Sequence, residues 1–388
     1  MKPFRFPTIL LTSLGLCLPV LSGCGDDGCG PEHVCTWAGT GQAAFNGDDL
    51  AREATALYWP MDVTFGPDGR AYVMDWNNHR VRRVEADGKM TTVIGTPTIG
   101  DGPEDLSDLR AEGALGTTVN LNHPTGLTFL PDGTGLLVAW HNHKLRTWDP
   151  STGRVRVLCG AGPGFRGDGG QVGAALMDQP KSAAVATDGT VYVLDQRNQR
   201  VRSIAPDGTV QTVVGTGEKG YGGDGGPALA AKLSFPTGGN PQPGGAVVLD
   251  GKGTLYVADT DNHRVRAVDL ATGVIRTVVG TGTVGPSVSE AAALEATLNA
   301  PRDLAMDAKG RLYIADTDNH VVRRLEPETG RLRTVVGTGT RGFTGDGEAP
   351  EEAQLARPFG IELDSEGNLF IADTYNHRIR RVPAEALK

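Results

Sequence analysis

The chain of 388 residues is poor in charged and aromatic side chains, and its charge is unbalanced toward acid. Charged residues make up 21% and aromatic residues 6%, and the formal net charge is -9. The acidic balance argues against a nucleic-acid partner, because phosphates need a basic face. The few aromatic residues suggest no base-stacking platform either. The chain is instead rich in Gly (55) and Pro (24), a composition typical of turn-rich all-β proteins.

The sequence also offers no comfortable membrane-spanning segment near its start. The apolar stretch at residues 9–20 is short for a bilayer, and it follows two basic residues, Lys2 and Arg5. Leu21-Ser22-Gly23-Cys24 comes next. This arrangement resembles a bacterial lipoprotein signal with its lipobox. The resemblance implies that residues 1–23 are a signal peptide, that Cys24 carries a lipid, and that residues 24–35 form a tether to a membrane.

An ordinary secretory signal cleaved nearby is the alternative interpretation, and both signals export the protein to a bacterial cell envelope. In lipoproteins an Asp directly after the acylated cysteine often causes retention at the inner membrane. Gly25 occupies that place here. We therefore expect the outer membrane or the cell surface.

Cysteine is scarce, with five residues in the whole chain. Cys17 falls in the signal and Cys24 in the lipobox. Cys29 and Cys35 lie close together in an oxidising compartment, which favours a disulfide between them. Cys159 occupies the place of Val279 in the equivalent stretch of another repeat, so we expect a small buried hydrophobic residue and not a reactive thiol.

A stretch at residues 255–282 recurs six times and organises the chain. Each unit contains four short runs rich in Val and Ile, separated by a DxxNH turn and by turns that contain Gly. This pattern predicts four antiparallel strands per unit. A proline precedes the first run of every unit: Pro60, Pro124, Pro180, Pro236, Pro301 and Pro358.

The motif DTDNHRVRAV at residues 259–268 resembles the NHL repeat, whose members build β-propellers with one four-stranded blade per repeat. The resemblance covers residues 36–388 and implies an all-β, six-bladed propeller. The last unit stops after its third strand, and Thr36-Trp37-Ala38-Gly39 fits the missing place. We therefore expect the N-terminal strand to close the ring. The units depart from the pattern at Ala139, Lys144, Gln199 and Val321.

Two insertions interrupt the repeat, one directly before the first strand of the fourth unit and one in the connection from Gly100 to His123. We expect both to leave the strands untouched. Alternate connections of a blade emerge on one side, so the prolines and the DxxNH turns share one face. Loops on a rigid frame often carry function. We therefore expect a ligand to bind on this face, at the channel mouth formed by Met61, Asp62, Thr125, Lys181, Ser182, Arg302, Asp303 and Phe359; the alternative is that these residues only solvate the channel.

Repeated acidic and basic residues are best explained as scaffold, because partly buried charges in stacked blades must be paired. Ala139 leaves one arginine to find another partner. The aspartates of the GDG loops, Asp168, Asp224 and Asp346, are expected to cap short helical turns; calcium binding is the alternative, although each loop has few ligands. The repeated positions are Asp75, Asp195, Asp259, Asp316 and Asp373, and Arg82, Arg146, Arg202, Arg266, Arg323 and Arg380.

Histidines also recur in the turns, which raises a metal hypothesis. Side chains from separate blades should lie too far apart to share one ion, so we expect a structural role. The trio His123, His141 and His143 is the one local cluster worth a metal titration. The remaining turn histidines are His79, His263, His320 and His377.

The first functional hypothesis is a monomeric, non-enzymatic binding module for a protein or glycan ligand, without a cofactor. The second is an enzyme resembling the peptidyl-hydroxyglycine amidating lyase, which uses zinc and calcium, or a calcium-dependent lactonase. Such sites need His or acidic ligands on the axis, where Asp62 and Asp303 are the acidic candidates and no nucleophile with its base is evident. The third is a structural envelope protein that acts through its lipid and its shape.

Overall fold

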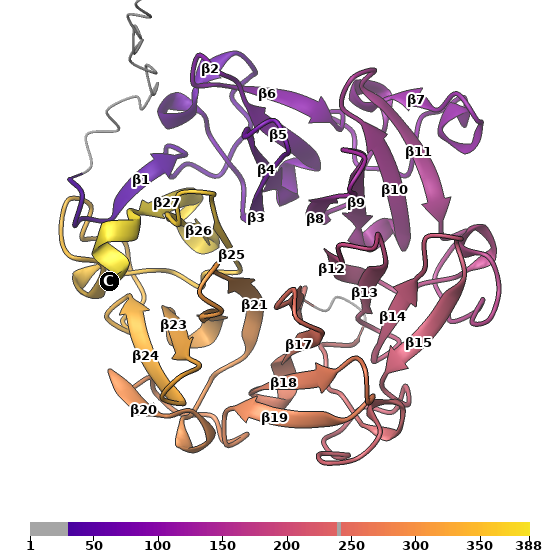
Figure 1. Ribbon diagram of the computed structural model, residues 1–388. Helices are drawn as coiled ribbons and strands as arrows, with labels where there is room; N and C mark the ends of the chain where they lie inside the picture. Colours follow the sequence, from indigo (N-terminus) through magenta and orange to yellow (C-terminus); the bar gives the residue numbers. More distant parts are fainter. Residues whose placement is uncertain (1–29, 239–241) are drawn as a thin grey trace, which may run out of the picture.

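The computed structural model describes residues 30–238 and 242–388, and these form a closed ring of six blades around a central axis (Figure 1). Each blade is an antiparallel sheet whose first three strands follow one another outward from the axis in sequence order, with the fourth strand outside them. Short fifth strands extend blades one, two and five: β2 (Leu50–Ala51), β7 (Ala114–Leu115) and β20 (Glu290–Ala292). The all-β, six-bladed propeller expected from the repeats is confirmed.

The strands of the first three blades have these bounds. Blade one contains β3 (Pro60–Phe65), β4 (Ala71–Asp75), β5 (Arg80–Val84) and β6 (Lys89–Ile94). Blade two contains β8 (Pro124–Phe129), β9 (Gly135–Ala139), β10 (Lys144–Asp149) and β11 (Arg154–Cys159). Blade three contains β12 (Pro180–Val185), β13 (Val191–Asp195), β14 (Arg200–Ile204) and β15 (Val210–Val214).

The other three blades follow the same order. Blade four contains β16 (Val247–Leu249), β17 (Thr254–Asp259), β18 (Arg264–Asp269) and β19 (Ile275–Val279). Blade five contains β21 (Pro301–Met306), β22 (Leu312–Asp316), β23 (Val321–Glu326) and β24 (Arg331–Val336). Blade six contains β25 (Gly360–Leu363), β26 (Leu369–Asp373), β27 (Arg378–Val382) and β1 (Cys35–Ala38).

Single 3-10 turns are the helical elements of the described residues. Five follow the second strand of a blade: η2 (Trp76–Asn78), η5 (Trp140–Asn142), η8 (Thr260–Asn262), η10 (Thr317–Asn319) and η12 (Thr374–Asn376). The others are η1 (Arg52–Ala54), η3 (Ser107–Leu109), η4 (Gly116–Thr118), η6 (Val172–Ala174), η7 (Ala228–Ala230), η9 (Ala293–Glu295), η11 (Pro350–Glu352) and η13 (Ala384–Leu387). Across residues 30–238 and 242–388, no helix is long and apolar enough to traverse a bilayer.

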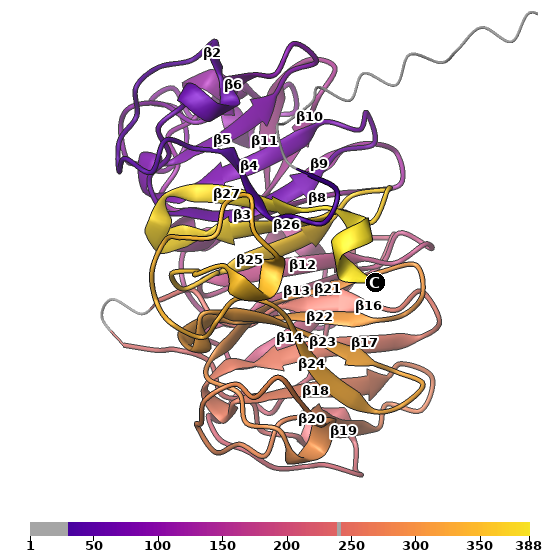
Figure 2. The ribbon, with the colours of Figure 1, turned by 90° about the vertical axis from the view of Figure 1, so that its left-hand side faces the viewer.

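The ring closes through β1, which pairs antiparallel with β27 as the outer strand of blade six (Figure 1). Cys35 lies opposite Arg381, and Ala38 lies opposite Ile379. Seen from its edge, the disc presents β27, β26 and β25 side by side, with the C-terminal turn near them (Figure 2). The N-terminal strand therefore completes the last blade, as the sequence predicts.

The hydrophobic core is divided among the interfaces between blades. Six clusters of buried apolar side chains are present in the described residues, and each joins two neighbouring blades. Cys159 belongs to the cluster between blades two and three, is 1% exposed, and has a pKa raised to about 12 by burial. It is a free cysteine and a packing residue, as expected.

The cysteine tether lies mostly outside the described residues. Cys35 is disulfide-bonded, but Cys29 and Cys24 fall within residues 1–29. The Cys29–Cys35 pairing and the lipid on Cys24 remain predictions.

The insertion before blade four changes a strand, which the sequence did not predict. β16 contains three residues, whereas β12 contains six. The first strand of blade three begins pairing at its proline, Pro180, which lies opposite Asp195. In blade four, β16 begins pairing only at Val247, opposite Val257. Gln242, just before this strand, instead contacts Arg357 and Tyr375 near blade six. The expectation that both insertions leave the strands untouched is therefore wrong for blade four.

Candidate functional site

The turn after the second strand ties each blade to the next one. In five blades it ends in a histidine in the left-handed conformation, with φ between 51° and 58°. Its Nδ1 accepts a backbone N–H that lies just before the next blade, as His263 does from Ala300 at 3.1 Å. Gln199 does the same in blade three, where its Oε1 accepts the N–H of Phe235. The other acceptors and donors are His79 and His123, His143 and Gln179, His320 and Arg357, and His377 and Trp59.

The histidine cluster contains His79 instead of the predicted third member, His143, beside His123 and His141. His123 Nδ1 lies 2.8 Å from His141 Nδ1, and the ring of His123 lies 4.5 Å from that of His79. His143 turns instead toward Asp178, 3.0 Å away. Burial lowers the pKa of His123 to about 3 and that of His141 to about 4. Within the described part of the chain, no three His, Cys, Asp or Glu side chains are arranged as ligands of one metal ion.

Buried Asp–Arg ion pairs hold the second and third strands of five blades. In the pair Asp259–Arg266 the nitrogen and oxygen lie 3.3 Å apart, and both side chains are fully buried. Asp259 also accepts the side-chain N–H of Asn262 and the backbone N–H of Ser234. One carboxylate thus fixes the turn, the arginine and the incoming chain. The other pairs are Asp75–Arg82, Asp195–Arg202, Asp316–Arg323 and Asp373–Arg380.

Blade two replaces the missing aspartate with acids from the long connection. Arg146 is fully buried, and Ala139 takes the place of the aspartate on the neighbouring strand, so Arg146 has no partner there. Its guanidinium forms ion pairs with Asp108 and with Asp101, the latter at 2.7 Å. The insertion at residues 100–123 therefore serves the scaffold of blade two.

The GDG aspartates do not cap helical turns, contrary to the sequence-based expectation. The 3-10 turns η6, η7 and η11 have no side-chain cap. Asp168 instead accepts from Arg202 at 2.7 Å and from the hydroxyl of Thr212 at 2.6 Å. The carboxylate links the outer loop to the third and fourth strands. Asp224 and Asp346 bind Arg266 and Arg380 in the same way.

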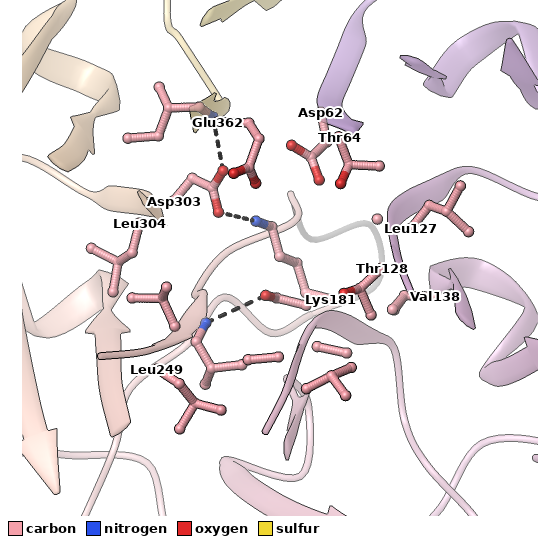
Figure 3. Close-up of a pocket in the computed structure, with 18 residues that line it drawn as sticks. Asp62, Thr64, Leu127, Thr128, Val138, Lys181, Leu249, Asp303, Leu304 and Glu362 are labelled. Carbon is pink, nitrogen blue, oxygen red and sulfur yellow. Dashed lines mark hydrogen bonds and ion pairs between the residues drawn. The ribbon is translucent and has the colours of Figure 1, made fainter. Parts of the chain in front are cut away.

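A cavity of about 240 Å³ lies on the axis, lined by the first strands of all six blades (Figure 3). A β-bulge near the start of β3, β12 and β21 interrupts the alternation of side chains there, and bulges often re-aim a side chain. Lys181 donates to the backbone oxygen of Arg302 at 3.0 Å and to Asp303 at 3.4 Å. Asp62 and Glu362 point into the same space (Figure 3).

The axial acids are poised to hold protons. Burial and Asp303 raise the pKa of Asp62, and burial raises the pKa of Asp303 despite the nearby Lys181. Burial and Asp303 together raise the pKa of Glu362 to about 7. Three carboxyl groups facing one ammonium group cannot all ionise at low cost.

The face that carries the prolines and the DxxNH turns, here called the proline face, contains a second hollow. We call it the aromatic cleft; it has a volume of about 210 Å³. Trp59 stacks on Tyr375 with ring centroids 5.3 Å apart, and Trp76 continues the row at 6.1 Å from Trp59. The cleft is lined by Trp59, Met61, Trp76, Gln242, Pro243, Phe359, Thr374 and Tyr375.

Trp76 and Trp140 stand where other blades keep a scaffold threonine. Thr260, Thr317 and Thr374 occupy the first place of this turn in blades four to six, and each hydroxyl donates to the carbonyl of the next blade's proline. Tryptophan cannot make this contact, and Trp76 presents its ring to the aromatic cleft. With tryptophan in place of threonine, the hydrogen bond to the next blade is lost, and an aromatic ring lines the cleft instead. Comparing this turn position between units would have revealed it in the sequence.

The blade-four insertion forms the other wall of the aromatic cleft. Gln242 accepts from Arg357 at 2.8 Å and donates to the hydroxyl of Tyr375 at 3.3 Å, both near blade six. Arg357 also donates to Tyr375 at 2.9 Å. The aromatic rings therefore carry a rim of polar groups, as ligand pockets commonly do.

The predicted channel-mouth residues divide between the two hollows. Asp62, Lys181, Ser182 and Asp303 line the axial cavity, whereas Met61 and Phe359 line the aromatic cleft. The other two are buried in the walls: the hydroxyl of Thr125 donates to the backbone oxygen of Lys181, and Arg302 donates to that of Pro243. Whether any of the eight binds a ligand remains a prediction.

Comparison with known families matches the NHL repeat to residues 241–267 and 298–325, within blades four and five. The match adds to the six-bladed architecture and to the turn geometry above. The chain is an NHL-repeat β-propeller.

Several relatives share this NHL-repeat region. Protein SUPPRESSOR OF QUENCHING 1 of Arabidopsis thaliana is 30% identical over 67% of this chain and 25% of its own length. NHL repeat-containing protein 2 of Homo sapiens is 28% identical over 66% of this chain and 38% of its own length. The NHL propeller thus spans well under half of these relatives.

Solved structures share the fold of this NHL propeller at low identity. An auxiliary nutrient binding protein from Bacteroides ovatus superposes with a TM-score of 0.62 at 17% identity, over 90% of this chain and 76% of that one. A gluconolactonase from Xanthomonas campestris has a TM-score of 0.53 at 14% identity, over 91% and 94% of the two chains.

Proposed function

We propose that this NHL propeller is an exported, lipid-anchored binding module that holds a glycan in the aromatic cleft. The observation that carries the proposal is the row of Trp76, Trp59 and Tyr375, partly exposed on the proline face and bordered by Gln242 and Arg357. A sugar ring has an apolar C–H face that packs on aromatic rings, and hydroxyls at its edge that reach polar groups.

The proposal favours a glycan over a protein ligand because of the size of the hollow. A volume of about 210 Å³ suits one or two sugar rings, whereas a stable protein partner needs an extended patch with a larger apolar core. A solved propeller of the same fold is described as an auxiliary nutrient binding protein, which agrees with a binding role.

Tryptophan fluorescence during titration with a glycan panel tests the site. Trp76→Thr installs the residue that blades four to six keep, so the fold should persist while one ring is removed. We expect Trp76→Thr and Trp59→Ala each to weaken glycan binding about tenfold, a loss of about 1.4 kcal/mol. Tyr221→Ala removes an exposed aromatic ring of the outer loops and should leave affinity unchanged. Binding that survives both tryptophan substitutions contradicts the proposal.

The lipid anchor is tested separately from ligand binding. Cells labelled with a palmitate analogue should incorporate it into the wild-type protein, and Cys24→Ser should lose both the label and membrane association. Cys159→Ser serves as the matched control, because that thiol is buried inside the propeller. Labelling that persists in Cys24→Ser would remove the lipoprotein interpretation.

A metal-dependent enzyme is the second candidate, and the axial cavity is the observation that favours it. Asp62, Asp303 and Glu362 converge there around Lys181. In the described residues they are not arranged as a set of metal ligands, so we derive no catalytic step. Stoichiometric zinc or calcium in purified protein, lost in Asp62→Asn, would move the function to the axis.

A further inference from the structure

An uncompensated positive charge lies behind the aromatic cleft. Arg302 is 5% exposed, and its guanidinium donates to the carbonyl of Pro243 and, at 3.4 Å, to Gln242. Its Nε has no hydrogen-bond partner, and no described carboxylate lies within ion-pair distance of it. The guanidinium packs against the ring of Phe359, 4.8 Å from the ring centroid, and that ring lines the cleft.

Neighbouring acids do not neutralise Arg302, because other cations already hold them. Asp318 forms an ion pair with Arg357 at 2.6 Å, and Asp261 forms one with Lys219 at 2.7 Å. Burial lowers the pKa of Arg302 to about 10, so the group stays charged at neutral pH. A buried charge is usually paired or hydrogen-bonded on all sides, and Arg302 is neither.

Two further arginines gather at the same end of the aromatic cleft. The guanidinium of Arg357 lies 4.9 Å from the ring centroid of Tyr375 and 5.2 Å from that of Phe359. Arg341, which is exposed, lies 5.4 Å from the ring centroid of Tyr375. This end, the arginine end of the cleft, carries excess positive charge in a chain whose net charge is -9.

The geometry points to an acidic glycan as the ligand of the aromatic cleft. Its sugar rings pack on Trp59 and Trp76, and its carboxylate or sulfate group lies at the arginine end, beside Arg357 and within the field of Arg302. In a partly dry pocket such a field is much stronger than in bulk water. The surplus acid elsewhere on the protein repels anions, so the arginine end provides selectivity as well as attraction. This inference rests on the proposed glycan-binding function.

Matched pairs of oligosaccharides separate this inference from the proposed function. The probes are hexagalacturonate and its methyl ester, a sulfated and a desulfated chondroitin hexasaccharide, and neutral cellohexaose. We expect the acid of at least one pair to bind about tenfold more tightly than its neutralised or less acidic form at low salt, and the advantage to shrink at high salt. The galacturonate pair reports a carboxylate site, and the chondroitin pair reports a sulfate site.

Two arginine variants and one aromatic variant complete the test. Arg341→Gln removes an exposed arginine without a buried contact, and Arg357→Gln removes the central one; both should reduce the preference for the acid form. Trp76→Thr should weaken both members of a pair equally. Equal affinity for acid and neutral forms, with binding still lost in Trp76→Thr, overturns the acidic ligand and leaves the proposed function standing. Absence of binding to all probes overturns both.

Discussion

At the scale of single residues, the propeller keeps the repeated arginine of the third strand paired even when its usual partner is missing. Arg146 is fully buried, and Ala139 replaces the aspartate that the other blades use. Asp108, itself 3% exposed, supplies the carboxylate from the long connection before blade two. A loop that looks like a functional insertion in the sequence thus completes the charge balance of a blade.

This pairing predicts that loss of Asp108 strongly destabilises the protein and that a second substitution can restore much of the lost stability. Asp108→Ala leaves Arg146 with only the half-exposed Asp101, so we expect the free energy of unfolding to fall by about 3 kcal/mol. The double variant Asp108→Ala with Ala139→Asp restores the arrangement of the other blades and should recover at least half of the loss. Urea unfolding measures both, and Glu104→Ala on the same loop should change stability by less than about 0.5 kcal/mol.

Residue by residue, the sequence predicts the scaffold better than the binding surface. The Asp–Arg pairs and the structural role of the turn histidines follow from repetition, because a residue kept in every blade serves every blade. The aromatic cleft depends on exceptions such as Trp76 and Trp59, whose neighbours come from blades one, four and six. Periodicity within one unit cannot place such residues together. Differences between units at one position can.

At the scale of elements, the closure of the ring depends on β1, a short outer strand. It contributes four residues, and it is held by β27 on one side only. Trp37 is 9% exposed and packs against Phe370 with ring centroids 5.0 Å apart. The strand closes the circle through its row of hydrogen bonds to β27, a hydrogen bond from Thr36 to Asp346, and the packing of Trp37 and Ala38 in the cluster between blades six and one.

Removal of this strand tests its role in closure. Deletion of residues 36–45 exposes the edge of β27 and the cluster around Phe370, so we expect the melting temperature to fall by about 10 °C or more, or the protein to associate through the open edge. Calorimetry and light scattering measure the two outcomes. Truncation of residues 1–29 keeps β1 and is the control. An unchanged melting temperature in the deletion variant would argue against closure by β1.

The blade-four insertion shows where prediction of elements fails. The sequence showed the composition of the insertion and its position in the repeat, and it predicted the face of the ring on which the insertion lies. Its path toward blade six was not visible, because that path depends on contacts with other blades. Arg302 donates to the carbonyl of Pro243, and Gln196 accepts the N–H of Gly244. Contacts between distant units decide the course of an inserted loop, and a single sequence does not encode them in a periodic signal.

At the scale of the whole molecule, all six blades line the axial cavity, and Glu362 in that cavity makes the stability of the fold depend on pH. Glu362 ordinarily has a pKa near 4.5, and the fold raises it to about 7. Between these values the folded protein holds a proton that the unfolded chain has released. Stability from this group is therefore greatest at low pH and is lost as the pH rises through about 7.

Glu362→Gln removes this pH dependence. Glutamine resembles the protonated side chain, so we expect equal stability of variant and wild type at pH 5 and a variant more stable by about 2 kcal/mol at pH 8. Denaturant unfolding at the two pH values measures the difference. Glu351→Gln, on an exposed turn, should follow the wild type at both. A variant only as stable as the wild type at pH 8 would show that the fold does not raise the pKa of Glu362.

The pairing of β1 with β27 also sets the order in which the molecule can be assembled. Thr36 and its partner Arg380 are separated by almost the whole sequence, so this hydrogen-bonded row is the longest-range contact of the fold. Long loops close slowly, because their ends must first meet. We therefore expect β1, which is synthesised well before β27, to pair late. Until β27 is made, the chain is an incomplete circle, so we expect closure to be the final step of folding.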